Sequence, residues 1–158
     1  MKVVICSLNS QYIHSSLAPW CLAAGMEKWG NPAVSTEVLE GTVNQEPEGL
    51  FQRLREAEAD VVGFCCYIWN ISLIHGLVER VKAWRPETIV VLGGPEAAFR
   101  AEELLLNWPA ADYIQAGEGE YPFALLMNRL YAGREPADVS GLCRRLPEGG
   151  MVLQPPYR

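Results

Sequence analysis

The sequence predicts an α/β protein built on a doubly wound parallel sheet, with helices covering both of its faces. Three observations predict this fold. Strand-like apolar runs alternate with helical patterns from residue 2 to residue 131. The segment Asp60–Cys66 is continuously apolar after its first residue, as expected for a strand covered on both faces. Two further apolar runs, in Val90–Glu96 and Asp112–Glu120, stop at glycines, which is typical of strand ends that approach a ligand closely.

Each element follows from the spacing of its apolar residues. Five segments have the composition of strands: Lys2–Leu8, Val34–Leu39, Asp60–Cys66, Thr88–Leu92 and Ala111–Gln115. Five others have apolar residues at helical spacing: Ser15–Trp29, Glu46–Ala59, Ile71–Trp84, Arg100–Asn107 and Tyr121–Tyr131. In the flavodoxin-like order 2-1-3-4-5, these strands form a five-stranded parallel sheet.

The last residues follow a different pattern. Gly141–Leu146 and Met151–Gln154 flank a turn sequence at residues 147–150, which predicts a small C-terminal β-hairpin. The final segment, Gln154–Arg158, is rich in proline and has no helical pattern. We therefore interpret residues 136–158 as a hairpin and linker that lead to a domain missing from this sequence.

Composition argues against several classes of protein. A chain of 158 residues buries about 70% of its unfolded surface as one domain. A net charge of −6 without a basic cluster argues against a nucleic-acid partner, and no apolar run reaches the ~20 residues of a membrane span. Because an apolar strand directly follows Met1, we expect no signal peptide. Five cysteines without a Cys-x-x-Cys pair are typical of free thiols, so we expect a cytoplasmic protein.

In the predicted strand order, a crevice lies above the first and third strands. The loop after the first strand is rich in side chains that hydrogen-bond or coordinate, namely Asn9, Gln11, Tyr12 and His14. A purely structural interpretation stands beside the functional one, because Asn9 can close the turn and the following serines can cap the next helix. A lone histidine such as His14 more often makes an ordinary hydrogen bond.

The loop after the third strand, Tyr67–Asn70, contains two large aromatic residues. These rings either cover the edge of the core or form flat walls for a large planar ligand. Asn70 is better explained as a helix cap than as a catalytic residue. The double glycine Gly93-Gly94 weakens a buried strand, which favours a close approach by a ligand or by backbone.

Glycines and glutamates alternate after the fifth predicted strand. Gly117 and Gly119 flank Glu118, and Glu120 follows them at the start of the last helix. Glu120 can complement the dipole of that helix. Glu118 has no such structural explanation, so it indicates a contact with a ligand hydroxyl or with a partner domain.

Several nucleotide-binding folds are excluded by the residues. No glycine occurs between Met1 and Gly25, where a dinucleotide-binding turn needs glycines. The P-loop sequence G-x-x-x-x-G-K-[ST] is absent. A phosphoacceptor domain carries an aspartate at the end of the third strand, whereas this chain has Cys65 and Cys66 there.

Together these segments resemble the cobalamin-binding domain at the N-terminus of corrinoid-dependent radical SAM enzymes. The resemblance rests on Lys2–Leu8, Asp60–Asn70, Leu92–Glu96 and Asp112–Glu120. It implies a cobalamin-binding domain over residues 1–135, with the corrin ring across the strand ends and its nucleotide tail in a slot between sheet and helices.

The same resemblance assigns roles to individual residues. Gly93 and Gly94 would let the nucleotide tail pass, and Cys65 and Cys66 stand where the family often has small hydroxyl residues. The loops around Tyr12, Tyr67 and Gly117 would touch the ring. The cofactor-binding residues implied in this way are Asn9, Gln11, Tyr12, His14, Cys65, Cys66, Tyr67, Gly93, Gly94, Gly117, Glu118 and Gly119.

Two departures from related families limit the expected chemistry. Corrinoid mutases carry Asp-x-His-x-x-Gly after the first strand, and this pattern falls here on Asn9-x-Gln11-x-x-His14. An amide replaces the imidazole, so we expect cobalt without a protein ligand on its lower face, with His14 as the alternative ligand. The radical SAM pattern Cys-x-x-x-Cys-x-x-Cys is absent, so S-adenosylmethionine and a [4Fe-4S] cluster are implied only for the missing domain.

The resemblance therefore predicts a module that holds a corrinoid for a downstream radical SAM domain, in a methyltransferase or in a ring-forming enzyme. This chain would not be catalytic by itself. Two alternatives remain open: a non-catalytic docking domain that has lost the ligand, and a stand-alone enzyme that uses His14, Tyr12 and Glu118 as acids and bases.

Overall fold

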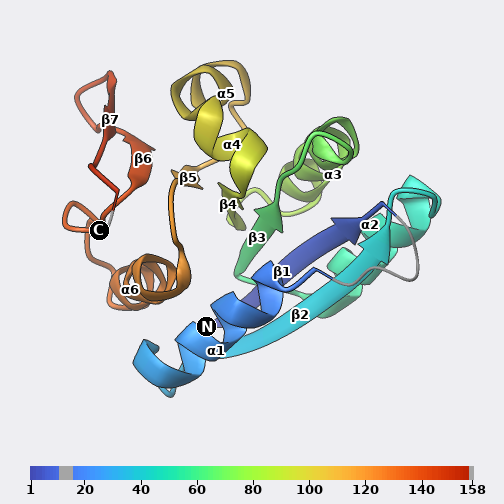
Figure 1. The fold of residues 1–158 in the computed structure, drawn as a ribbon, viewed down its shortest axis with the longest axis horizontal. Coiled ribbons are helices and arrows are strands. Elements are labelled where there is room, and N and C mark those ends of the chain that lie inside the picture. Colours follow the sequence, from blue (N-terminus) through green and yellow to red (C-terminus); the bar gives the residue numbers. More distant parts are fainter. Residues whose placement is uncertain (11–15, 157–158) are drawn as a thin grey trace.

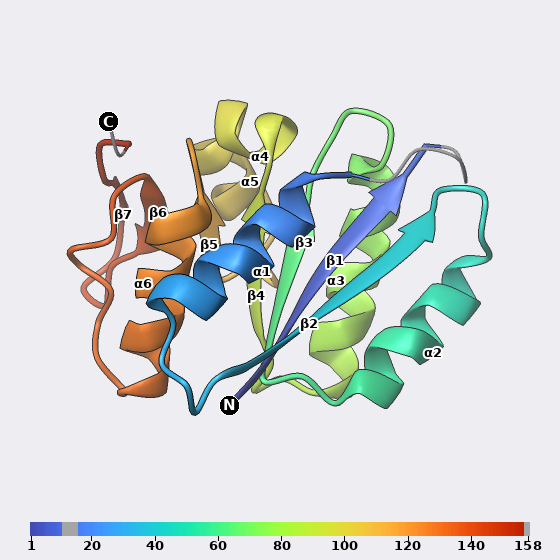
Figure 2. The same cartoon turned by 60° about the horizontal axis from the view of Figure 1, so that its bottom comes forward.

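The computed structural model describes residues 1–10 and 16–156 of the chain. Its centre is one sheet with the strand order β2-β1-β3-β4-β5-β6-β7, shown in Figure 1 and, turned by 60°, in Figure 2. The strands are β1 (Lys2–Asn9), β2 (Ser35–Thr42), β3 (Val61–Cys65), β4 (Ile89–Gly93), β5 (Tyr113–Gln115), β6 (Leu142–Arg145) and β7 (Met151–Leu153). The first five pair in parallel, which confirms the predicted order 2-1-3-4-5.

Within residues 1–10 and 16–156, six helices cover the sheet on both faces. They are α1 (Ala18–Trp29), α2 (Pro47–Ala57), α3 (Ile71–Trp84), α4 (Pro95–Phe99), α5 (Ala101–Asn107) and α6 (Glu120–Tyr131). Helices α1 and α6 lie side by side on one face, and the other four helices cover the opposite face (Figures 1 and 2). None of the helices in the described part of the chain is long and apolar enough to cross a membrane.

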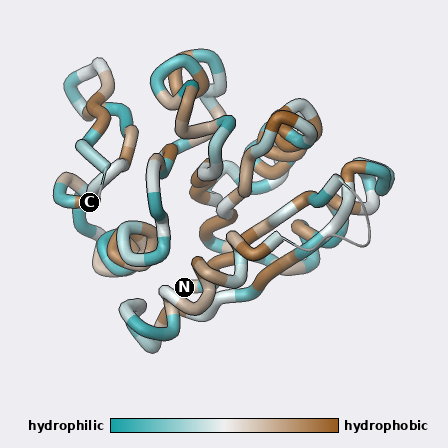
Figure 3. The backbone as a smooth tube through the Cα atoms, viewed as in Figure 1, coloured by the Kyte–Doolittle hydropathy of each residue, from teal (hydrophilic) through white to brown (hydrophobic). Residues whose placement is uncertain are grey.

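The strands divide their side chains between two hydrophobic cores because successive residues of a strand point to opposite faces. In β3, Val62 and Phe64 enter the core under α2 to α5, whereas Val61 and Cys65 enter the core under α1 and α6. Figure 3 shows runs of hydrophobic residues along the central strands of the sheet.

Several elements differ from the sequence-based prediction: α1 begins at Ala18, later than predicted, and β5 begins at Tyr113 instead of Ala111. Strand β2 continues to Thr42 instead of ending at Leu39, because its last residues pair with β1 although they are not apolar. The short helix α4 was not predicted, since five residues are too few to show a helical period. It begins at Pro95, directly after Gly94, in agreement with the preference of proline for the first turn of a helix.

The predicted hairpin is present, and it joins the main sheet. Strand β6 pairs antiparallel with β5, and β7 pairs with β6. Leu142 and Cys143 are fully buried, one in each core. The guanidinium of Arg145 donates hydrogen bonds to the carbonyl oxygens of Leu105 and Ala111, 2.5 and 2.6 Å away. The hairpin is therefore fixed to the sheet edge and to the end of α5.

Candidate functional site

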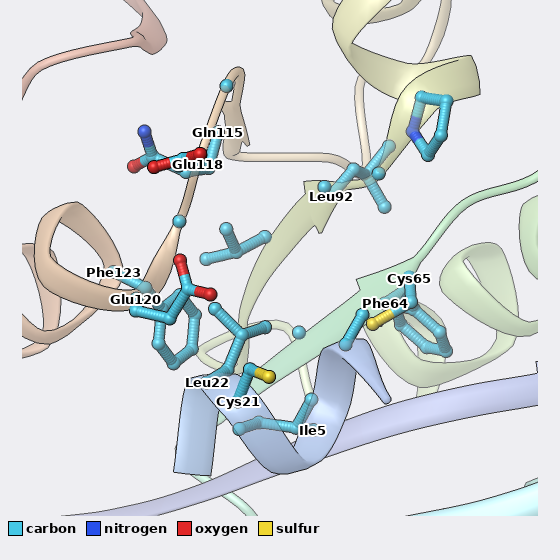
Figure 4. Close-up of a pocket in the computed structure, with 18 of the residues that line it drawn as sticks. Ile5, Cys21, Leu22, Phe64, Cys65, Leu92, Gln115, Glu118, Glu120 and Phe123 are labelled. Carbon is cyan, nitrogen blue, oxygen red and sulfur yellow. The ribbon is translucent and has the colours of Figure 1, made fainter. Parts of the chain in front are cut away.

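A cavity of about 320 Å3 lies between the sheet and the helices α1 and α6, at the carboxyl ends of β3, β4 and β5 (Figure 4). Its volume is at the lower end of the range of small-molecule sites, about 300–1,000 Å3. Apolar side chains from both layers make up much of its wall: Ile5, Leu17, Ala18, Leu22, Val91 and Phe123. A cavity of this kind suits a flat apolar group that enters from the strand ends.

Two glycines keep the sheet side of the cavity open. A Cβ atom built on Gly93 would meet only one atom within 4 Å, the backbone oxygen of Gln115 at 3.6 Å. A Cβ atom built on Gly63 would touch the ring of Phe123 at 3.5 Å. A side chain at Gly93 would therefore extend into the cavity, so this glycine keeps the space open and does not serve a positive φ.

The neighbouring Gly94 has a different role. Its φ of +91° is in the region that favours glycine, and a Cβ atom there would lie 2.6 Å from the backbone oxygen of Cys66. The amide of Cys66 donates a hydrogen bond to the oxygen of Gly93 at 2.7 Å. At Gly94, the predicted close approach is made by the backbone of Cys66. At Gly93, no such approach is seen among the described residues, and the glycine borders the open cavity.

The loop after β3 presents an aromatic pair at the rim of the cavity. The rings of Tyr67 and Trp69 stack with a centroid separation of 4.5 Å and an angle of 3° between their planes. Tyr67 lines the cavity, and Ile68 next to it is 79% exposed. The loop therefore provides flat apolar surface at the strand ends.

Asn70 holds this loop in place. It directly precedes α3, at the N-cap position. Its side chain makes no capping hydrogen bond, however, which differs from the predicted role as a helix cap. Its side-chain amide instead donates to the backbone oxygens of Leu8 and Cys65, at 3.1 and 3.0 Å, and its oxygen accepts from the amide of Tyr67 at 2.8 Å. The fully buried carboxamide thus ties the ends of β1 and β3 to the aromatic loop.

The adjacent cysteines Cys65 and Cys66 point to opposite faces of the sheet. Cys65 lines the cavity, and burial raises the pKa of its thiol to about 12. Cys66 is fully buried in the other core, where burial also raises the pKa of its thiol. Both thiols are therefore protonated at neutral pH. Within residues 1–10 and 16–156, no three His, Cys, Asp or Glu side chains are grouped so as to hold a metal ion.

The connection from β5 to α6 forms another side of the cavity. Gly117, Glu118 and Gly119 line it, together with Glu120 at the start of α6. Helix α1 packs closely against this point, because a Cβ atom on Gly25 would lie only 2.6 Å from the backbone oxygen of Glu120. The close contact between α1 and α6 thus fixes the backbone of Glu120 at the rim.

Seven of the predicted site residues line this one cavity: Cys65, Tyr67, Gly93, Gly94, Gly117, Glu118 and Gly119. Asn9, at the end of β1, and Cys66 do not line it. Gln11, Tyr12 and His14 lie outside the described residues. The role of each of these residues in binding a cofactor stays a prediction.

Sequence reasoning missed the helix side of the cavity, including Cys21 and Leu22 of α1 and Phe123 of α6. It also missed Gln115, which is only 5% exposed. The side-chain nitrogen of Gln115 donates to the backbone oxygen of Ser140 at 2.7 Å, while its side-chain oxygen has no partner among the described residues. The signal available in the sequence was a polar residue inside an otherwise apolar strand end.

Comparison with known proteins finds a family model and relatives that match large parts of this chain. The family model named B12 binding domain matches residues 3–127. Over 92 residues the chain is 35% identical to 2-(S-pantetheinyl)-carbapenam-3-carboxylate methyltransferase of Streptantibioticus cattleyicolor, covering 54% of this chain and 14% of the relative. Over 150 residues it is 26% identical to cytidylyl-2-hydroxyethylphosphonate methyltransferase of Streptomyces wedmorensis, covering 85% of this chain and 28% of the relative.

A solved structure shares the fold across nearly the whole chain. The cobalamin-dependent S-adenosylmethionine radical enzyme OxsB, with aqua-cobalamin and S-adenosylmethionine bound, superposes with a TM-score of 0.83 at 16% identity. The match covers 99% of this chain and 22% of OxsB. The chain therefore spans between 14% and 28% of the length of these three proteins. Because the family model matches most of the sequence, the chain belongs to the B12 binding domain family.

Proposed function

We propose that this domain binds cobalamin, with the corrin ring across the carboxyl ends of the strands and the nucleotide tail in the cavity between the sheet and helices α1 and α6. The observation that carries the proposal is the cavity itself, with Gly63 and Gly93 in its floor. A Cβ atom at Gly93 would enter this space, so the floor fits a ligand group that lies directly against the strands.

The chemistry of the lining supports the same assignment. The base of the nucleotide tail is flat and largely apolar, and the inner walls are formed by side chains such as Ile5, Leu22 and Phe123. The corrin ring needs broad apolar contact outside the cavity, which the stacked Tyr67 and Trp69 and the exposed Ile68 offer. These residues would hold the two halves of the ligand.

We further propose that the domain serves a radical SAM methyltransferase. Both curated relatives described above are named methyltransferases, and the chain spans only part of each. Cobalamin, when bound, would supply a redox-active cobalt centre for methyl transfer. Pro156 packs against Gly117 at the edge of the cavity, so a catalytic domain that follows residues 136–158 would start beside the bound ring.

The test is an absorbance titration of the purified chain with hydroxocobalamin, followed by desalting to measure the cobalamin that is retained. We compare Gly93→Val, which fills the cavity floor, with Gly76→Val, which adds the same side chain to α3 where no atom lies within 4 Å. The account predicts retention by the wild type and by Gly76→Val, and an affinity at least about tenfold weaker in Gly93→Val.

Two outcomes would overturn the proposal. Equal binding by Gly93→Val and the wild type would place the ligand outside the cavity. Failure of this chain to retain cobalamin would favour the alternative of a docking domain that has lost its ligand. Circular dichroism of each variant serves as the control for folding.

A further inference from the structure

Three hydrogen-bond acceptors lie together on one side of the cavity, and we call Gln115, Glu118 and Glu120 the acceptor edge (Figure 4). Gln115 is at the end of β5 and is 5% exposed, and its side-chain oxygen has no partner among the described residues. It points to the face that carries the cavity, because it alternates with Ile114, which enters the other core.

The two glutamates of the acceptor edge have no ion-pair partner among residues 1–10 and 16–156. The side chains of Glu118 and Glu120 form no hydrogen bond or ion pair within the part of the chain that the structure describes. No Lys, Arg or His is found among the described residues that line the cavity. The described lining of the cavity therefore carries two carboxylates and one buried, unpaired amide oxygen, and it includes no cationic side chain.

This arrangement favours one kind of ligand group. Carboxylate and amide oxygens accept hydrogen bonds from uncharged N–H and O–H donors. A buried acceptor left without a donor costs free energy, and two like charges placed close together repel each other. A ligand that presents neutral donors to this edge satisfies it, whereas a ligand that presents a carboxylate there is repelled.

We propose that the acceptor edge recognises the primary amide groups at the periphery of the corrin ring, and that it selects fully amidated corrinoids over those in which such an amide is a carboxylate. The inference rests on the proposed function and specifies the ligand of the same site. A primary amide and a carboxylate have nearly the same size and shape, so the selection depends on donor capacity and charge and not on fit.

The experiment compares hydroxocobalamin with its three monocarboxylic acids, in each of which one propionamide of the ring is hydrolysed. Dissociation constants come from absorbance titrations of the complete chain at low ionic strength. We expect the wild type to bind at least one acid about tenfold more weakly than hydroxocobalamin. In Glu118→Gln/Glu120→Gln this preference should fall to about twofold or less, because the repelling charges are gone.

The matched control is Glu27→Gln/Glu102→Gln, which removes the same charge from exposed positions on α1 and α5 that do not line the cavity. It should keep the preference of the wild type. Gln115 is not replaced, because its side chain also holds the hairpin through Ser140.

The outcomes separate the two proposals. Tight binding of hydroxocobalamin with equal binding of all three acids would overturn the selection by the acceptor edge and leave the cobalamin site standing. An unchanged preference in Glu118→Gln/Glu120→Gln would do the same. Absence of any corrinoid binding would overturn both proposals together.

Discussion

The two faces of the sheet are built from the same strands, yet a cavity lies at the carboxyl end of one of them in the described structure. On the face covered by α2 to α5, here called the packed face, side chains such as Leu77 and Ile74 are completely buried. On the face covered by α1 and α6, Gly63 and Gly93 leave a cavity of about 320 Å3. Since strand residues alternate between faces, one strand can stabilise the fold with one set of side chains and leave space for a ligand with the other.

The pair Cys65 and Cys66 shows this division within two residues. Cys66 is fully buried among the side chains of the packed face, and Cys65 is 5% exposed at the cavity. The comparison suggests that substitutions on the packed face change stability, and that substitutions around the cavity change ligand binding.

The largest expected effect is a loss of folding stability, and it compares a side chain removed from the packed face with one removed from the wall of the cavity. Leu77→Ala removes a completely buried side chain, and it should lower the free energy of unfolding by about 3 kcal/mol while the affinity for cobalamin is retained. Leu22→Ala removes a half-buried side chain that already borders empty space, so the loss should be about 1 kcal/mol. Urea denaturation measures both values. Equal losses would show that the two faces are packed to the same degree.

A smaller effect on the free energy of unfolding is expected when either of the two adjacent glycines is replaced by alanine. Gly94→Ala should lower the free energy of unfolding by about 2 kcal/mol, because its φ is positive and its Cβ would meet the backbone of Cys66. Gly93→Ala should change stability by less than about 1 kcal/mol and should weaken cobalamin binding instead. If Gly93→Ala proved the more destabilising of the two, the assignment of one glycine to the turn and the other to the ligand would be wrong.

Much of the fold could be predicted because the parallel strands and most of the helices have clear apolar periods. The order 2-1-3-4-5, the hairpin and the cover of helices on both faces are confirmed by the structure. Helix α4 was missed because it has only five residues. The addition of the hairpin to the main sheet could not be predicted, since it depends on tertiary contacts such as those of Arg145.

The sequence predicted the residues of the candidate site that lie at the strand ends, but not those contributed by helices α1 and α6. Glycines that interrupt apolar strands are visible in a sequence, and those at Gly93 and Gly117 do line the cavity. Apolar residues of a helix show the same spacing whether they face a filled core or an empty cavity, so Cys21, Leu22 and Phe123 gave no signal. The family resemblance, in contrast, is confirmed by the match to the B12 binding domain.

The measurement that tests the central claim most directly is the rate at which Cys21 reacts with a small maleimide, with and without methylcobalamin in the dark. All five cysteines are free thiols, and Cys21 is the one among them that is not buried; it also lines the cavity. Mass spectrometry locates the label, and Cys21→Ser serves as the control that should remain unlabelled.

If the nucleotide tail occupies the cavity between the sheet and helices α1 and α6, methylcobalamin at ten times its dissociation constant should slow the labelling of Cys21 about tenfold. A chain that binds methylcobalamin while Cys21 reacts at its original rate would contradict the account, because the ligand would then occupy a different part of the molecule.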